Sequence, residues 1–512
     1  MKQQILSILS LILGPSHVAQ DPGLLVATGQ GAVAGTLIVP TVRQFLGIPY
    51  GTAKRWQPAQ IPPVRHNVFQ ATKYADGCLQ NLAPANSKYL ILNGNGGTDV
   101  PSSEDCLAVN IWAPSKDRKQ NTAVLIWIHG GGFVFGTSGI PAFEGTNMVR
   151  DNDDITLVTI NYRLNIFGQP NPPQYSEKIN VNFGLLDVHA AIHWVHANIA
   201  NFGGDPNRIT IAGQSAGGTA VDAYTFAHPN DTIVKGVIEQ SGRQAFIVFC
   251  GICDHTDWTR VASAVGCGGD GTLQQMTCMR TIAAPILEQA VMSTGASFNL
   301  VLDNVTIHED FQARADKGNL LRVPLLVGST AHEEDIFLVA RQLSTTGLII
   351  PALTEIYSDA SSGFIGTCPS SATAAQRLNM GVPTFRYQYE GVFRSLSTRP
   401  DLRAYHSAEI PMIFGTYNST VIDGGVPASA EQIALSKYMQ SAWVAFARDP
   451  VGGLPSVGWP LYNPNTSTLA QLGNFFNTSG VVFEESAVVD AVCNHQGVLA
   501  EIIFQSSQVL DG

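Results

Sequence analysis

The chain has 512 residues, of which 45% are hydrophobic and only 13% are charged, and its formal net charge is −11. This length and composition allow a large buried core, and no linker, repeat or low-complexity tract divides the chain, so we expect one large domain with insertions. The acidic balance argues against nucleic acid and anionic membrane surfaces as partners, because both carry the same sign of charge.

The N-terminus has the pattern of a secretory signal peptide. Lys2 gives a basic start, residues 5–13 are apolar, and Gly14-Pro15 breaks the run. The apolar stretch is too short to span a bilayer, and no other stretch is long and apolar enough to do so. We therefore predict a signal peptide over 1–19 and a secreted mature chain over 20–512 without stable membrane insertion. A buried N-terminal helix is the alternative.

Two further features agree with secretion. The number of cysteines is eight, an even number, as expected of disulfide-bonded proteins. Five Asn-x-Ser/Thr sequons offer candidate glycosylation sites, at Asn230, Asn304, Asn418, Asn465 and Asn477.

The first part of the mature chain is predicted to be β-rich. Residues 29–34 fit the G-x-G-x-x-A pattern of a dinucleotide-binding turn. That pattern needs a following helix, whereas residues 33–39 alternate as a strand does and run into Pro40. A β-hairpin is the better interpretation, and we expect no nucleotide cofactor. A second strand is predicted over 45–50.

The segment between Cys78 and Cys106 is predicted to be a surface flap. It contains a short apolar run, 89–92, which is followed by a run of Asn and Gly over 93–97. Such a run is flexible, and one short apolar cluster is too little for the large lid of an interfacial lipase.

A central strand leads into a glycine-rich turn. Residues 124–128 are five consecutive apolar residues, which is typical of a strand covered on both faces. The strand ends in His129-Gly130-Gly131-Gly132. Glycines at the carboxyl end of a strand expose backbone N–H groups and can stabilise an anion. A plain glycine-rich turn is the alternative.

A helix is predicted over residues 187–199. It carries His189, His193 and His196 on one face. No cysteine or carboxylate nearby in the sequence completes a metal site, so we interpret these histidines as packing or solvent residues and expect no metal.

The stretch around Ser215 organises the rest of the chain. Residues 208–212 predict a buried strand, 213–217 read Gly-Gln-Ser-Ala-Gly, and 216–226 predict a helix. In this strand–turn–helix context the motif Gly-x-Ser-x-Gly holds an exposed serine at a strained apex. Ser215 is therefore the candidate nucleophile. A glycine-rich loop with a capping serine is the alternative.

Strands and helices alternate after this turn. Strands are predicted over 234–238, 323–327 and 385–389, and helices over 258–292 and 432–448. Alternation of this kind predicts an α/β fold with a mostly parallel sheet that is flanked by helices.

A serine nucleophile needs a base and a group that orients the base. On α/β folds the usual chain order is Ser, acid, His. The loop after 323–327 contains Glu333 and Glu334, and His406 follows the 385–389 strand. Both the order and the loop placement fit.

These motifs together resemble the type B carboxylesterase, or cholinesterase-like, family, and most of all its secreted fungal members. The matching segments occur in the expected order along nearly all of the mature chain: FLGIPYG (45–51), EDCL with NIW (104–112), WIHGGGF (127–133), NYR (161–163), NFGLLD (182–187), NFGGDP (201–206), GQSAGG (213–218) and HSAEIPMIFGT (406–416). The resemblance implies a single α/β-hydrolase domain.

The resemblance also implies roles for individual residues. Ser215 would be the nucleophile, Glu333 the acid and His406 the base, and the backbone N–H groups of Gly131, Gly132 and Ala216 would form the oxyanion hole. It implies three disulfides, which pair Cys78 with Cys106, Cys267 with Cys278, and Cys368 with Cys493. Cys250 and Cys253 remain, and their pairing stays open.

The chain departs from the family pattern at three places. Gln214 stands where the family usually has Glu, Glu334 follows the candidate acid where Gly is usual, and the Cys78–Cys106 segment contains no Trp. Choline-binding members hold the substrate cation on that Trp through a cation–π contact, so these changes argue against a cholinesterase.

The sequence therefore predicts a secreted serine carboxylic-ester hydrolase that cleaves small, soluble, uncharged esters through an acyl-enzyme and needs no cofactor. An interfacial triacylglycerol lipase is the alternative within the same class. A non-catalytic binding or adhesion protein of the same fold is the alternative from another class. It is disfavoured because both the serine and the histidine are present.

Overall fold

The computed structural model describes residues 23–93, 100–174, 180–243, 255–268, 271–344, 351–397, 399–418 and 426–495. Within these residues the largest element is a mixed sheet of 11 strands. From one edge to the other the strands are β16 (Val481–Glu485), β15 (Ser467–Leu472), β14 (Thr384–Tyr389), β13 (Leu325–Thr330), β12 (Val234–Gln240), β11 (Gly204–Gln214), β9 (Thr122–Ile128), β10 (Ile155–Ile160), β8 (Ala108–Pro114), β4 (Val42–Pro49) and β3 (Thr36–Val39).

The middle of the sheet is parallel. All neighbouring pairs from β10 through β15 in the spatial order are parallel, and β9 pairs with β10 on one side and with β11 on the other. The strands beyond this block, β8, β4 and β3 at one edge and β16 at the other, are antiparallel. The carboxyl ends of the parallel strands therefore meet at one edge of the sheet, where ligand sites of open α/β sheets form.

Helices surround the sheet and occupy most of the connections between its strands. They are α1 (Pro84–Leu92), α2 (Thr146–Asp151), α3 (Asn165–Gly168), α4 (Phe183–Phe202), α5 (Ala216–Ala227), α6 (Thr256–Ala264), α7 (Leu273–Thr281), α8 (Ala284–Thr294), α9 (Phe311–Asp316), α10 (Asp335–Ser344), α11 (Pro351–Ser362), α12 (Cys368–Asn379), α13 (Ile410–Phe414), α14 (Ala430–Arg448), α15 (Gly453–Ser456) and α16 (Ser486–Val489). A π-helical turn, Gly363–Thr367, joins α11 to α12.

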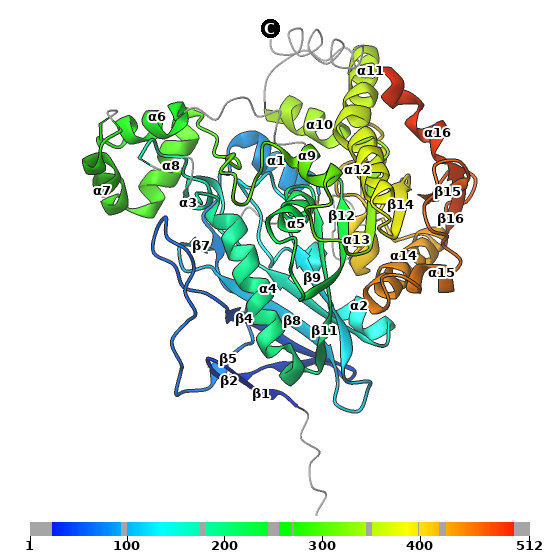
Figure 1. The fold of residues 1–512 in the computed structure, drawn as a ribbon, viewed down its shortest axis with the longest axis horizontal. Coiled ribbons are helices and arrows are strands. Elements are labelled where there is room, and N and C mark those ends of the chain that lie inside the picture. Colours follow the sequence, from blue (N-terminus) through cyan, green and yellow to red (C-terminus); the bar gives the residue numbers. More distant parts are fainter. Residues whose placement is uncertain are drawn as a thin grey trace, which may run out of the picture.

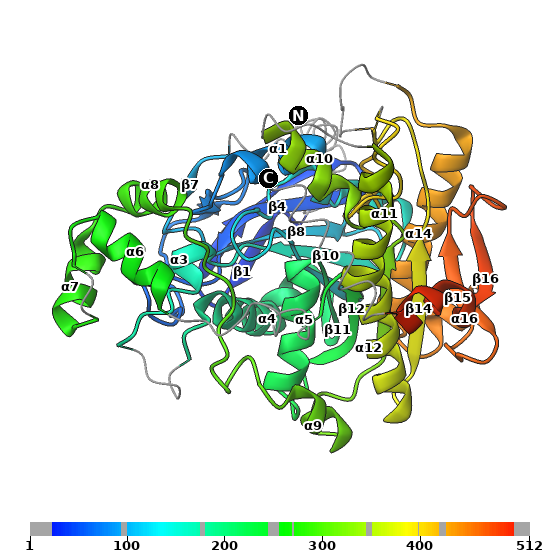
Figure 2. The same cartoon turned by 90° about the horizontal axis from the view of Figure 1, so that it is seen from above.

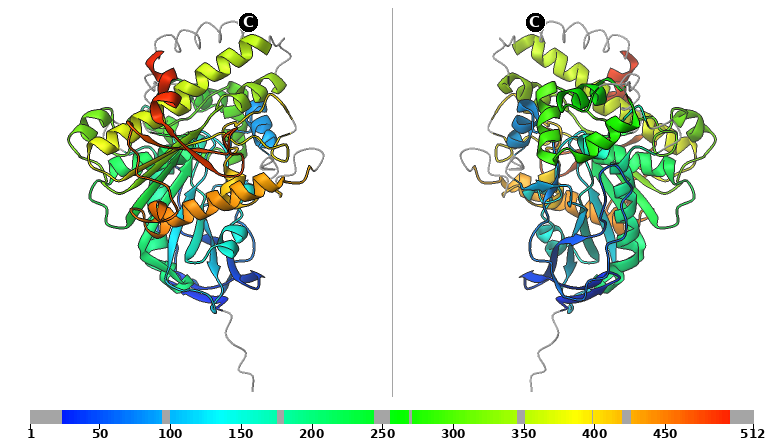
Figure 3. Two further views of the ribbon diagram at one scale, coloured as in Figure 1. Left: turned by 90° about the vertical axis from the view of Figure 1, so that its right-hand side faces the viewer. Right: turned by 90° about the vertical axis from the view of Figure 1, so that its left-hand side faces the viewer.

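The core consists of two layers, one on each face of the sheet. Along β9, Leu125 and Trp127 pack in one hydrophobic cluster with residues of α14, whereas Val124 and Ile126 pack in the other with residues of α4 and α5. Side chains of a strand alternate between its faces, so the continuous apolar run of β9 is buried on both sides. Figure 2 shows α4 and α5 together on one side of the strands, and α14 lies toward the viewer in the left view of Figure 3.

A third hydrophobic cluster lies in a helical lobe made of α6, α7 and α8 (Figure 1). The sequence predicted helix over 258–292, and the structure divides that segment into these three helices. Trp56 and Trp258 meet edge to face in the cluster with their ring centroids 4.9 Å apart, and the Cys267–Cys278 disulfide staples the lobe.

The segment between Cys78 and Cys106 differs from the surface flap that the sequence predicted. Its apolar run lies in α1, where Tyr89, Leu90 and Leu92 are buried. Helix α1 packs on α10, and the Tyr89 ring stacks on Phe337 with 5.4 Å between centroids. The difference arises because the apolar side chains of α1 belong to the hydrophobic core and pack against α10. They therefore do not form a loop over the surface.

The three disulfides implied by the family resemblance are formed: Cys78–Cys106, Cys267–Cys278 and Cys368–Cys493. Cys250 and Cys253, and the predicted signal peptide, lie outside the described residues. Four of the sequon asparagines are exposed and the fifth, Asn477, is half-buried. None of the helices in the described ranges is long and apolar enough to cross a membrane.

Candidate active site

Ser215 lies at the sharp turn between β11 and α5, as the sequence predicted. Its backbone has φ 57° and ψ −124°, a strained conformation for a residue with a side chain. A Cβ atom on Gly213 would lie 2.3 Å from the backbone of Gly217, and one on Gly217 would lie 2.0 Å from the carbonyl oxygen of Ile128. Only glycine fits at either position, and this close backbone packing fixes Ser215 at the apex.

The glycine-rich turn after β9 lies beside the serine. Gly131 and Gly132 have φ angles of 109° and 61°, which favour glycine, and a Cβ atom on Gly131 would lie 2.1 Å from the carbonyl oxygen of Phe135. Gly132, Ser215 and Ala216 line the same pocket. The three candidate oxyanion donors, Gly131, Gly132 and Ala216, thus belong to two turns at the carboxyl ends of adjacent parallel strands, β9 and β11.

His129, which begins that turn, is neutral. Burial lowers the pKa of His129 to about 4, and its Nδ1 lies 2.8 Å from the carbonyl oxygen of Gly130. A neutral ring that donates from Nδ1 to this carbonyl fixes the start of the turn without placing a positive charge in it.

A backbone bridge brings Glu333 and His406 together. His332 pairs with Tyr405 in a parallel bridge between the loop after β13 and the loop after β14, and the N–H of His332 donates to Ala404 O at 3.0 Å. The next residue of each loop is Glu333 or His406, so their side chains emerge side by side. His406 Nδ1 donates to Glu333 Oε2 in a short hydrogen bond.

Glu334 points elsewhere. Its carboxylate pairs with Arg341 and accepts a hydrogen bond from Ser361 Oγ at 3.1 Å, and its backbone N–H donates to Ser362 Oγ at 3.0 Å. Glu333 and Glu334 lie in a turn that the Asp335 N–H closes on His332 O at 3.2 Å, and of the two side chains Glu333 is the one that contacts His406. The two glutamates thus have different partners, His406 for Glu333 and Arg341 for Glu334.

The second oxygen of Glu333 is also occupied. Ser241 Oγ donates to Glu333 Oε1 at 2.6 Å, and the backbone N–H of Thr330 donates to the same atom at 2.8 Å. Ser241 directly follows β12. In the sheet, β12 lies between β11, which precedes Ser215, and β13, which precedes Glu333. Sequence reasoning missed it, although a Ser-Gly pair at the carboxyl end of a parallel strand was a signal that could have found it.

A further buried carboxyl group lies close to the site. Glu409 is fully buried at the start of α13 and accepts a hydrogen bond from Gln240 Nε2 at 3.0 Å. Burial, together with the nearby charge of Glu333, raises the pKa of Glu409 to about 7. The sequence analysis did not single out this residue.

The residue before the nucleophile reaches the candidate base. Gln214 is 2% exposed, and its side-chain Nε2 lies 3.0 Å from Nε2 of His406. This contact was also missed, because residue spacing alone does not reveal where a side chain at the end of a strand points.

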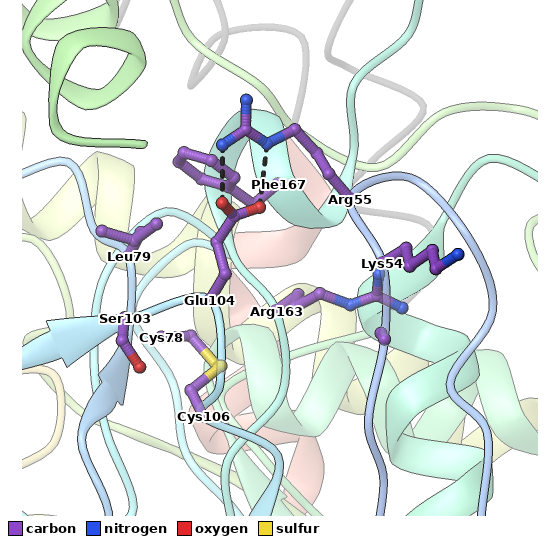
Figure 4. A pocket seen from close by; sticks show the side chains of 10 residues that line it. Lys54, Arg55, Cys78, Leu79, Ser103, Glu104, Cys106, Arg163 and Phe167 are labelled. Carbon is purple, nitrogen blue, oxygen red and sulfur yellow. Dashed lines mark hydrogen bonds and ion pairs between the residues drawn. A yellow bond between two sulfur atoms is a disulfide. The ribbon is translucent and has the colours of Figure 1, made fainter. Parts of the chain in front are cut away.

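The Cys78–Cys106 disulfide supports the glycine-rich turn. Just beyond Cys78, Gln80 Oε1 accepts the Gly136 N–H at 2.7 Å, and the Asn81 N–H donates to Val134 O at 2.8 Å. Figure 4 shows the disulfide beside the paired side chains of Arg55 and Glu104.

Arg55 then connects this region to the helical lobe. Its Nη1 donates to the carbonyl oxygens of Met279 and Ile282 at 3.1 and 2.6 Å. The hollow lined by Arg55, Glu104 and the Cys78–Cys106 disulfide has a volume of only about 10 Å³, so it holds no more than a water molecule and we assign it a structural role.

Two hollows meet at Ser215. The smaller has a volume of about 140 Å³, contains His406, and is bounded by Phe133, Thr219 and Leu300. The larger has a volume of about 500 Å³, and its walls include the aromatic rings of Tyr89, Phe135 and Phe337, together with the Glu334–Arg341 ion pair. An ester bound with its carbonyl at Ser215 would therefore place its two halves in hollows of different size.

The three helix histidines are not part of this site. His189 Nε2 lies 2.7 Å from His193 Nε2, and the His189 ring stacks on His228 with 4.2 Å between centroids. The described residues contain no group of three or more His, Cys, Asp or Glu side chains that could hold a metal ion.

Comparison with known proteins shows the family of this chain. The model of the carboxylesterase family matches residues 22–348 and 349–485. The chain belongs to the carboxylesterase family. This finding confirms the predicted α/β-hydrolase fold and the predicted activity, so the protein is a carboxylic ester hydrolase.

Several curated relatives of this esterase align along most of its length. It is 34% identical to a chlorogenic acid esterase of Aspergillus niger, over 84% of each chain. It is 32% identical to secreted lipase 5 of Gibberella zeae, over 96% of this chain and 98% of the relative. It is 28% identical to the para-nitrobenzyl esterase of Bacillus subtilis, over 86% and 93% of the two chains.

Proposed function

We propose that Ser215, His406 and Glu333 are the catalytic triad of this esterase, and that the backbone N–H groups of Gly131, Gly132 and Ala216 form its oxyanion hole. The observation that carries the proposal is the hydrogen bond between His406 Nδ1 and Glu333 Oε2, in a pocket that His406 shares with the strained Ser215.

The proposed reaction proceeds through an acyl-enzyme. His406 Nε2 takes the proton of Ser215 Oγ as this oxygen attacks the ester carbonyl, and Glu333 stabilises the imidazolium that results. The N–H donors hold the oxyanion of the tetrahedral intermediate, and each is worth about 2.7–4 kcal/mol of barrier. His406 returns its proton to the leaving alcohol, and water repeats the steps to release the acid. Protein groups and water suffice for every step.

Two substitutions test the triad. Ser215→Ala and His406→Ala should each lower kcat by roughly 10⁴–10⁶ without unfolding the protein. A fluorophosphonate probe should label the wild type at Ser215 and leave Ser215→Ala unlabelled. A folded Ser215→Ala variant with near-complete activity would overturn the proposal.

We further propose that the substrates are soluble, uncharged esters in which one of the two groups joined by the ester bond is of short to medium length. A cavity of about 150 Å³ is large enough for a benzene ring. The smaller hollow, at about 140 Å³, therefore limits one half of the ester to about the size of a single ring or a short chain.

The charge of the larger hollow supports the same substrate class. Glu334 lines it, but this carboxylate pairs with Arg341, so the pair adds no net charge. The Tyr89 ring stacks face to face on Phe337 with 11° between the planes, which leaves less aromatic surface for a cation.

Measurements of kcat/KM on matched esters test this substrate class. The series should fall off at long acyl chains, without a rate increase above the solubility limit. The kcat/KM for acetylcholine should be no higher than that for 3,3-dimethylbutyl acetate, an ester of the same shape without the charge. A sharp rise on emulsified long-chain triglyceride would establish the lipase alternative, and a clear preference for the choline ester would contradict the argument from charge.

We also propose that the mature enzyme is secreted. The predicted signal peptide, the three disulfides and the five sequons support this location. Expression of the full chain in a secreting fungal host, followed by N-terminal sequencing of the protein in the medium, tests it. Enzyme that stays inside the cells with residue 1 intact would contradict it.

A further inference from the structure

The loop that joins β15 to β16 carries the two most exposed large apolar side chains in the described part of the chain. Phe475 is 89% exposed and Phe476 is 85% exposed. Their rings meet edge to face with 5.7 Å between centroids, so they form one patch. The hairpin lies at an edge of the large sheet (Figure 1). Aromatic side chains that are exposed side by side indicate a surface that something covers.

The loop holds the two rings in a defined turn. The N–H of Asn477 donates to Asn474 O at 2.8 Å, and the N–H of Phe476 donates to Asn474 Oδ1 at 2.7 Å. Asn474 is itself anchored, since its Nδ2 donates to Glu390 Oε2 at 3.1 Å. The two phenylalanines thus occupy the central positions of a turn that ends at Asn477. A patch that is already ordered loses little conformational freedom when it is covered.

The turn ends on the asparagine of a sequon. Asn477-Thr478-Ser479 is one of the five sequons, and it is the one that directly follows two phenylalanines. Asn477 Nδ2 donates one of its two N–H groups to Val481 O at 3.3 Å, and Asn477 Oδ1 accepts a hydrogen bond from Ser479 Oγ at 3.2 Å. A sugar on Nδ2 would replace the other hydrogen and leave both hydrogen bonds in place. N-glycans are added as the chain enters the secretory pathway, so the half-buried position of Asn477 in the folded protein does not hinder the transfer.

We propose that Asn477 carries an N-glycan whose first sugar packs on Phe475 and Phe476. In the transfer, Asn477 Nδ2 forms a bond to C1 of the sugar and loses one proton, while the bond from C1 to the pyrophosphate of a lipid-linked oligosaccharide donor breaks. One face of a pyranose ring consists of C–H groups, which the negative face of an aromatic ring attracts. The inference rests on the proposed secretion of the enzyme, because the oligosaccharide donor belongs to the secretory pathway.

Two other occupants fit the patch less well. A second protein needs about 800 Å² on each side of a stable interface, whereas two aromatic side chains supply about 300–500 Å². An anionic lipid surface would meet a protein whose formal net charge is −11. The glycan needs neither a large area nor a favourable charge, and the sequon tethers it beside the rings.

The test uses the full chain secreted by a fungal host. Glycopeptide mapping should find Asn477 occupied in most molecules. Hydroxyl-radical footprinting then measures how fast Phe475 and Phe476 are oxidised. In Ser479→Ala, which lacks this sequon, both rings should be oxidised several-fold faster than in the wild type, because no sugar covers them. If this variant fails to fold, removal of the glycans from the native wild type by a peptide N-glycosidase gives the same comparison.

Ser467→Ala is the matched control. It removes the sequon at Asn465, which follows a proline and lies before β15, whereas Asn477 follows that strand. Oxidation of the two phenylalanines should then proceed at the wild-type rate. A rate that rises as much as in Ser479→Ala would show that the protection does not come from the glycan on Asn477, and would overturn the proposal.

Other outcomes would also overturn the proposal. Among them are an unoccupied Asn477 in the secreted protein and equal oxidation rates in wild type and Ser479→Ala. Binding of the glycosylated wild type to phosphatidylcholine vesicles, if it is lost in the double variant Phe475→Ala/Phe476→Ala, would identify a lipid surface as the occupant. A wild-type dimer that the same double variant dissociates would identify a second copy of the chain. Failure of the secretion proposal would appear separately, as protein that stays inside the cells with residue 1 intact.

Discussion

Ser241 donates a hydrogen bond of 2.6 Å to Glu333 Oε1, the oxygen that His406 does not use. The carboxylate is therefore held at both oxygens, by a hydroxyl from the loop after β12 on one side and by the imidazole on the other. A carboxylate fixed in this way can keep the ring of His406 in one orientation throughout the reaction.

Ser241→Ala should reduce kcat about tenfold with little change in KM, because a hydrogen bond to a charged group contributes about 1.5–3 kcal/mol and only part of this is lost in the transition state. The matched control is Ser358→Ala. Ser358 donates a similar hydrogen bond, 2.5 Å long, to Asp335, a carboxylate outside the triad. The control should lower the melting temperature and leave kcat near wild type. Equal effects of the two substitutions on kcat would contradict a specific role for Ser241.

Glu333→Gln should lower kcat by roughly 10³–10⁴, since an amide at this position fails to stabilise the imidazolium and can impose the wrong tautomer. Glu334→Gln should change kcat less than tenfold and mainly destabilise the fold, because it removes a buried carboxylate that is paired with Arg341. Steady-state kinetics and thermal unfolding of both variants separate the two roles. A larger loss of kcat in Glu334→Gln would reverse the assignment of the acid.

Glu409→Gln should change how stability depends on pH. The pKa of Glu409 is raised in the folded protein to about 7, from an ordinary value of 4.5. The folded protein thus holds the proton more tightly than the unfolded chain, so this stabilisation is complete below pH 4.5 and is lost as the pH rises through 7. Gln retains an oxygen for the Gln240 donor and does not titrate.

The free energy of unfolding of the wild type, relative to Glu409→Gln, should therefore fall by roughly 3 kcal/mol between these two pH values. Denaturant unfolding of both proteins across that range gives this difference directly. Parallel curves for the two proteins would mean that Glu409 does not change its proton affinity on folding.

Gly366→Ala should impair catalysis through Glu333. A Cβ atom at this position would lie 2.6 Å from Cγ and 2.9 Å from Oε1 of Glu333, whose buried carboxylate has no room to move aside. We expect kcat to fall at least about tenfold, since a displaced acid disturbs the base that it orients. Gly363→Ala is the control, because its Cβ would meet the side chain of Val492 at 2.8 Å and not a triad residue. An undiminished kcat in folded Gly366→Ala would show that Glu333 tolerates displacement.

The sequence predicted those parts of the site that depend on local pattern. The apolar run of β9 and the Gly-x-Ser-x-Gly turn specify their strands and turns through neighbouring residues alone, and the structure agrees with both. Ser241, Gln214 and Glu409 could not be predicted in the same way. Their contacts depend on which strand ends lie side by side and on side-chain direction, and tertiary packing determines both.

Three secondary-structure elements were missed for related reasons. Helix α1 contains only a short apolar run and precedes a stretch of Asn and Gly, so its local signal indicates a loop, and its burial comes from contacts with α10. Strands β15 and β16 form one edge of the sheet. Strand β16 is short and half-exposed, so its apolar periodicity is weak.

The Cys368–Cys493 disulfide has a consequence for the timing of biosynthesis. The π-helical turn Gly363–Thr367 packs against Glu333 on one side and Val492 on the other, and the next residue, Cys368, is joined to Cys493 across 125 positions of the chain. The packing on one side of Glu333 therefore involves a segment that is bonded to a cysteine synthesised 125 positions later. A nascent chain that already contains residues 215, 333 and 406 still lacks this bond until residue 493 has been added.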